Sequence, residues 1–107
     1  MPRYIVRRTF QGGLALPPTP AGAAVCLGVV EQNARVGVTW VHSYVTDDLD
    51  TTFCIYDGPN PEAIREAATR NGLPVDEITR VTVLDPYFYQ GAAGLAQPAG
   101  AQEGATS

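Results

Sequence analysis

Two helix start signals, each placed after a segment of strand-forming residues, constrain the fold of this chain more than any other feature. The dipeptides Thr19-Pro20 and Asn60-Pro61 each place a capping side chain directly before a proline. A proline at the first helical position loses no hydrogen bond, and the residue before it can accept one from the first turn. We therefore expect one helix over residues 20–35 and a second helix over residues 61–71.

Four segments rich in β-branched and aromatic residues surround these helices in the chain. They cover residues 4–10, 38–45, 51–56 and 77–84. The second and third segments are joined by the acidic turn 47–50, which makes them the two arms of a hairpin. The resulting order, β-α-β-β-α-β, predicts a ferredoxin-like α+β fold, in which a four-stranded antiparallel sheet carries both helices on one face.

The length of 107 residues is enough for one domain, which we place at residues 1–90. Residues 91–107 contain six alanines, four glycines and no aromatic residue. Such a segment buries too little apolar surface to offset the entropy lost on ordering it. We therefore expect residues 91–107 to form a disordered tail.

Charge and hydropathy exclude several kinds of partner. The net charge is -4, whereas nucleic-acid binding favours a basic surface, so we expect no nucleic-acid partner. No apolar run approaches the roughly 20 residues of a membrane span, so no membrane partner is expected. The chain begins directly with a strand pattern instead of the apolar region of a signal peptide, which predicts a cytoplasmic protein.

Alternation along the predicted strands sorts their side chains between the two faces of the sheet. The sets that contain only apolar side chains are expected to pack against the helices, namely Val41, Val45, Phe53, Ile55, Val81 and Val83. The opposite face is then expected to gather Trp40, His42, Tyr44, Cys54, Tyr56 and Arg80. An aromatic patch of this kind usually marks an interface or a pocket. We therefore expect a homodimer through this face or the strand edges beside it, and we take Trp40, Tyr44 and Tyr56 as candidate ligand-binding residues.

His42 is the one histidine of the chain and the candidate metal ligand. Imidazole and thiolate both suit nickel, copper and zinc, so we take Cys54 as its partner in a metal site. A hairpin loop of three residues would place Cys54 opposite His42, whereas a loop of two or four residues would place Ser43 there. The alternative role for His42 is structural, as an imidazole hydrogen-bonded to a neighbour.

Sequence signatures of catalysis are absent from the chain. It has no dinucleotide-binding glycine pattern, phosphate-binding loop, zinc-protease motif or nucleophile elbow. No catalytic residues are therefore predicted.

Five segments carry short motifs that occur together: MPRYIV at the start, GVTWVHSYV at 37–45, TFCIY at 52–56, PEAIRE at 61–66 and NGLPVDEI at 71–78. With these segments the chain resembles a family of small bacterial nickel-binding proteins, once classed only as a domain of unknown function. The resemblance implies a dimeric ferredoxin-like fold and nickel as the bound metal, with no established catalysis. It identifies no ligand residue by residue, so the choice of His42 and Cys54 rests on their own chemistry.

Two other function classes fit the same pattern. One is a cofactor-free oxygenase or isomerase that binds an organic substrate between sheet and helices, in a pocket lined by Trp40, His42 and Tyr44. The other is an interaction module that binds no small ligand. Metal analysis of protein purified without an affinity tag separates nickel binding from both.

Overall fold

The computed structural model describes residues 1–88 and has the predicted order of elements. The strands and helices are β1 (Arg3–Thr9), α1 (Pro20–Ala34), β2 (Thr39–Val45), β3 (Thr51–Asp57), α2 (Pro61–Asn71) and β4 (Glu77–Val81). The sheet order is β2-β3-β1-β4, and every neighbouring pair is antiparallel. This confirms the ferredoxin-like α+β fold. The predicted tail, residues 91–107, lies outside the described residues.

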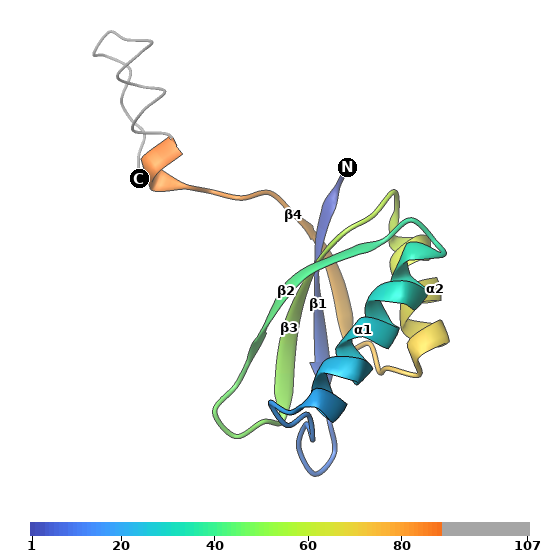
Figure 1. Cartoon of the computed structure of the whole chain (residues 1–107). Helices are drawn as coiled ribbons and strands as arrows, with labels where there is room; N and C mark the ends of the chain where they lie inside the picture. Colours follow the sequence, from blue (N-terminus) through green and yellow to red (C-terminus); the bar gives the residue numbers. More distant parts are fainter. Residues whose placement is uncertain (89–107) are drawn as a thin grey trace, which may run out of the picture.

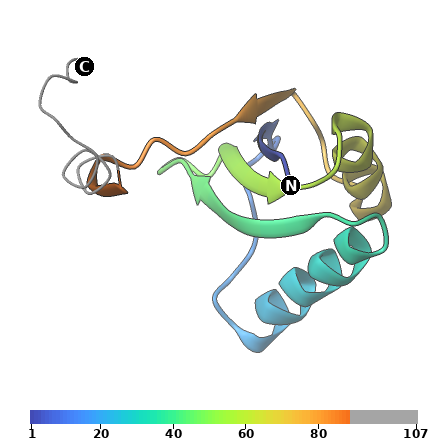
Figure 2. The same cartoon turned by 90° about the horizontal axis from the view of Figure 1, so that it is seen from above.

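Both helices lie on one side of the curved sheet, so the other side has no covering element within residues 1–88 (Figures 1 and 2). We call this second side the open face. It carries the side chains of Ile5, His42, Tyr44, Phe53 and Ile55, as the strand register shows.

The two helices begin at the caps that the sequence predicts. The Thr19 side chain accepts a hydrogen bond from the backbone nitrogen of Gly22, and Asn60 accepts one from Ala63 at 2.8 Å. Helix α2 ends at Gly72, whose φ of 66° lies in the left-handed region that glycine adopts without strain. Local sequence therefore sets both helix starts and the end of α2.

The hydrophobic core lies between α2 and the two central strands. Tyr4 and Val6 of β1 are buried against Tyr56 of β3 and against Ile64 and Ala67 of α2. Helix α1 contributes much less to this core. Its buried residues are Gly22 and Asn33, while several of its aliphatic side chains are exposed.

The predicted assignment of side chains to the two sheet faces was wrong for β3. Cys54 and Tyr56 are buried on the helix side, whereas Phe53 and Ile55 lie on the open face. The physical reason is volume. Helix α2 presents small side chains such as Ala67 to the sheet, so a large residue like Tyr56 is needed to fill the space between them.

In β2 the assignment was right for His42 and Tyr44 but wrong for Trp40, because of a β-bulge at Val41. Trp40 pairs with Tyr56, but His42 pairs with Ile55, so the register shifts by one residue between them. A bulge inserts an extra residue and reverses the alternation that follows it. Trp40 therefore packs against the core on the helix side, while His42 lies on the open face.

The ends of the strands differ from the expectation as well. Val45 has the register of the helix side but is exposed, and Val83 lies beyond the end of β4 and is also exposed. Arg80 pairs with Tyr4 and so shares the helix side, whereas its neighbour Val81 belongs to the open face. Side chains at the margins of a small sheet have too few neighbours to bury them.

Candidate functional site

His42 lies exposed on the open face, next to Tyr44 of the same strand. The two rings meet edge to face, with their centroids 5.1 Å apart and their planes at 87°. Within residues 1–88 the imidazole forms no side-chain hydrogen bond or ion pair. The alternative role, an imidazole hydrogen-bonded to a neighbour, therefore finds no partner among these residues. Its nitrogens are therefore available to a ligand that approaches the open face.

The structure does not bring the two predicted metal ligands together. Thr46 and Thr51 form the last backbone hydrogen bond of the hairpin, which leaves a loop of residues 47–50 and places Ser43 opposite Cys54. Cys54 is buried beneath the helices, and its Sγ lies 3.5 Å from the hydroxyl of Thr52. His42 and Cys54 therefore occupy opposite faces of one sheet. No group of three or more histidine, cysteine or acidic residues forms a metal site within residues 1–88.

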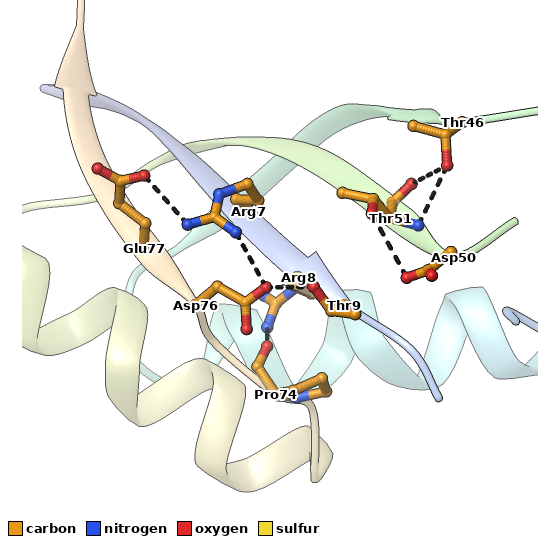
Figure 3. A network of polar contacts seen from close by, with 9 residues as sticks. All are labelled: Arg7, Arg8, Thr9, Thr46, Asp50, Thr51, Pro74, Asp76 and Glu77. Atoms are coloured by element: carbon orange, nitrogen blue, oxygen red, sulfur yellow. Dashed lines mark hydrogen bonds and ion pairs between the residues drawn. The ribbon is translucent and has the colours of Figure 1, made fainter. Parts of the chain in front are cut away.

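The acidic residues near the open face are engaged by arginines. Arg3 pairs with Asp57 through Nε and Nη2, at 2.7 and 3.0 Å. This contact lowers the pKa of the Asp57 carboxyl. Arg7 pairs with Asp76 and Glu77 at 3.3 and 3.4 Å (Figure 3). These carboxylates therefore already have cationic partners, from which a metal ion would have to separate them.

The three predicted ligand-binding residues divide between the two faces. Tyr44 is 62% exposed on the open face. Trp40 and Tyr56 line a cavity of about 200 Å³ between α1 and the sheet, together with Cys26 of α1. Trp40 also donates a hydrogen bond from Nε1 to the hydroxyl of Ser43 at 2.8 Å. Of the pocket residues expected for an oxygenase or isomerase, this cavity contains Trp40 but neither His42 nor Tyr44.

Arg8 is a functional candidate that the sequence reasoning missed. It lies in β1 with only 2% of its surface exposed, and it lines the same cavity. A signal for it exists in the sequence, because Arg7 and Arg8 are adjacent in a strand and must point to opposite faces. One of the two arginines therefore has to lie beneath the helices.

In the described part of the chain, residues 1–88, the Arg8 guanidinium has neutral partners only. Its Nη2 donates to the Tyr56 hydroxyl at 3.1 Å. Its Nη1 donates to the carbonyl of Pro74, a contact that Figure 3 shows. Its Nε has no hydrogen-bond partner, and within residues 1–88 no carboxylate pairs with this side chain. Burial raises the pKa of the Tyr56 phenol, while the charge of Arg8 opposes that shift. Tyr56 is therefore a neutral hydroxyl beside a cation that has no carboxylate partner among the described residues, and Cζ of Arg8 lies over the Tyr56 ring, 5.8 Å from its centroid.

These features define a small ferredoxin-like α+β protein with an uncovered aromatic sheet face and a cavity under its first helix. The chain belongs to the family described as nickel responsive protein SCO4226-like, whose model matches residues 4–81. This match confirms the family resemblance seen in the sequence.

A solved structure shows the same fold. The crystal structure of SCO4226 from Streptomyces coelicolor A3(2) is similar to this chain with a TM-score of 0.61 and 17% sequence identity, covering 78% of this chain and 99% of the other. No curated protein matches the chain. No helix within residues 1–88 has both the length and the apolar character needed to cross a membrane.

Proposed function

We propose that this protein is a nickel-binding protein in which His42 is a metal ligand. The observation that carries the proposal is the exposed His42 imidazole on the open face of a chain that belongs to a nickel-responsive family. A neutral imidazole suits nickel among the divalent metals. The role of Cys54 as a second ligand has no geometric support, because Cys54 lies on the opposite side of the sheet.

The donors that residues 1–88 of one chain provide do not form a closed nickel site, since the open face offers one imidazole and the nearby carboxylates are paired with arginines. We propose that a second copy of the chain completes the site. Two open faces packed against each other about a two-fold axis place each surface patch against the same patch of the partner. Each nickel site would then have two imidazole ligands, the His42 of each subunit, and water molecules would occupy the remaining coordination positions.

The open face itself supports a homodimer. Ile5, Phe53 and Ile55 form an apolar centre that no element within residues 1–88 covers, and Tyr44 stands exposed beside it. The ion pairs of Arg3 and Arg7 flank this centre. An apolar centre with a polar rim is the usual anatomy of a protein interface.

Nickel titration tests the metal proposal. We expect His42→Ala to weaken nickel binding at least ~10-fold, since it removes the nitrogen ligand from each subunit. The matched control is Thr79→Ala, which alters an exposed open-face residue in β4 and should bind as the wild type does. We also expect wild-type binding to weaken as the pH falls, because protons compete with the metal for a ligand nitrogen.

Calorimetry on untagged protein, with the folded state of each variant checked by circular dichroism, measures the affinity and the number of metal ions per chain. We expect one nickel ion for two chains. Equal affinity of wild type and His42→Ala would contradict the proposed ligand.

Sedimentation velocity tests the dimer separately. We expect Tyr44→Asp to convert a dimer into a folded monomer, because it places two like charges in the proposed interface. The matched control is Leu27→Asp, which changes an exposed apolar residue of α1 on the helix side and should leave the dimer intact. A wild-type monomer at tens of micromolar, or a dimer that Leu27→Asp disrupts and Tyr44→Asp does not, would contradict this interface.

A further inference from the structure

The cavity between α1 and the sheet combines an apolar wall with a buried cation. Apolar side chains from α1, from the loop before it and from β2 surround it, including Leu14, Val29 and Trp40. Arg8 lies on the sheet side of this wall with 2% of its surface exposed. A cavity of this kind has the usual composition of a small-molecule site, in which a few polar groups orient a mostly apolar ligand.

Arg8 is buried without the counter-charge that the other two arginines of its strand possess. Arg3 and Arg7 each pair with carboxylates, whereas the partners of Arg8 among residues 1–88 are the hydroxyl and ring of Tyr56 and a backbone carbonyl. Burying a charge is strongly unfavourable unless it is paired and fully hydrogen-bonded. The missing partner indicates that an anion from outside the described residues belongs beside this guanidinium.

The Nε–Nη2 edge of Arg8 is buried and only partly hydrogen-bonded, and it carries the two donors that a carboxylate can bind. In the same strand, Arg3 holds the two oxygens of Asp57 with Nε and Nη2. The corresponding edge of Arg8 carries an unpartnered Nε and an Nη2 that contacts Tyr56. A carboxylate in this position would accept two parallel hydrogen bonds, which is the strong bidentate arrangement, and the Tyr56 hydroxyl could donate a third.

We propose that this cavity binds a small organic carboxylate with an apolar body. Its carboxylate pairs with Nε and Nη2 of Arg8, and its apolar body lies against Trp40 and Val29. A cavity of about 150 Å³ is known to hold benzene, so about 200 Å³ suits a ligand of the size of an aromatic acid. The site lies on the helix side of the sheet and is independent of the nickel proposal for the open face.

Helix α1 is the element that would move away from the sheet when such a ligand enters the cavity. Its buried residues are Gly22 and Asn33, at its two ends, while Val25 and Leu27 between them are exposed. A cover with few buried contacts opens at low free-energy cost. This allows a ligand to reach Arg8 without disturbing the α2 side of the core.

Phenylacetate is a suitable probe, and phenylacetamide is its neutral counterpart of the same shape. Trp40 is the one tryptophan of the chain and lines the cavity, so its fluorescence reports occupancy. With a chelator present to exclude metal effects, we expect wild type to bind phenylacetate at least ~10-fold more tightly than phenylacetamide, because only the carboxylate pairs with the guanidinium. The test variant is Arg8→Met, which keeps an unbranched side chain and removes the charge.

We expect Arg8→Met to lose the preference for the carboxylate. The matched control is Arg7→Met, one residue along the strand and on the open face, which should keep it. The proposal is overturned if wild type binds neither compound at 10 mM, about the weak end of measurable affinity. It is also overturned if wild type binds both compounds equally. Both outcomes can be read even if Arg8→Met fails to fold. Retention of the preference by folded Arg8→Met overturns it too.

Discussion

Replacing Ile64 by alanine is expected to lower the free energy of unfolding by about 3 kcal/mol, the middle of the range for deleting a buried branched side chain. Ile64 is 1% exposed and packs in the core with Val6 and Tyr56. For a domain of this size the loss corresponds to a fall in Tm of roughly 15 °C. Because β1 and β3 are fixed by their hydrogen-bonded register, the sheet cannot collapse into the space that the side chain leaves.

Thermal and urea denaturation of the same variant measure this effect. The conservative variant Ile64→Val should lose only about 1 kcal/mol, since it removes one methylene group. The control is Arg65→Ala, at the next position of α2, where the side chain is exposed and the change should stay within about 0.5 kcal/mol. An Ile64→Ala variant as stable as Arg65→Ala would show that the core does not lie where the structure places it.

The second large effect is expected at Gly22, where α1 touches the loop before it. A Cβ atom at this position would lie 1.9 Å from the carbonyl oxygen of Pro17, which is far closer than atoms can approach. The obstacle is backbone, so the loop or the helix has to move. We expect Gly22→Ala to destabilise the protein by about 2 kcal/mol, a typical cost of forced overpacking.

Gly28 provides the matched control in the same helix. A Cβ there would meet nothing within 4 Å, so Gly28→Ala should stabilise the protein by about 0.8 kcal/mol through the higher helix propensity of alanine. The two substitutions are therefore expected to change the free energy of unfolding in opposite directions. The decrease at Gly22 reports the steric contact, and the increase at Gly28 reports helix propensity. Equal shifts of the urea midpoint in the two variants would contradict the close contact between Gly22 and Pro17.

The predicted metal pair and the predicted pocket depended on which side chains share a face of the sheet. Period-two alternation is reliable only in a strand without bulges, and the bulge at Val41 places Trp40 and His42 on opposite faces. A single sequence shows no signal for that extra residue. The position of Arg8 was predictable in part, since one of two adjacent arginines in a strand has to face the helices.

The sequence by itself determined the secondary structure and its order. Caps such as Thr19 and Asn60 and the left-handed Gly72 act through bonds to their nearest neighbours, so their effect can be recognised without the rest of the fold. Their order, with a hairpin between the helices, is enough to predict the ferredoxin-like arrangement.

The tertiary structure alone decided which side of the sheet became the core and which residues meet across it. Tyr56 is buried and Ile55 is not, because the small alanines of α2 leave a space that a large ring fills and because Arg8 satisfies the Tyr56 hydroxyl. His42 and Cys54 lie on opposite faces because the register of the hairpin pairs Cys54 with Ser43 and His42 with Ile55. Volume and hydrogen-bond satisfaction are properties of residues that are distant in the chain, and these residues become neighbours only once the sheet has formed.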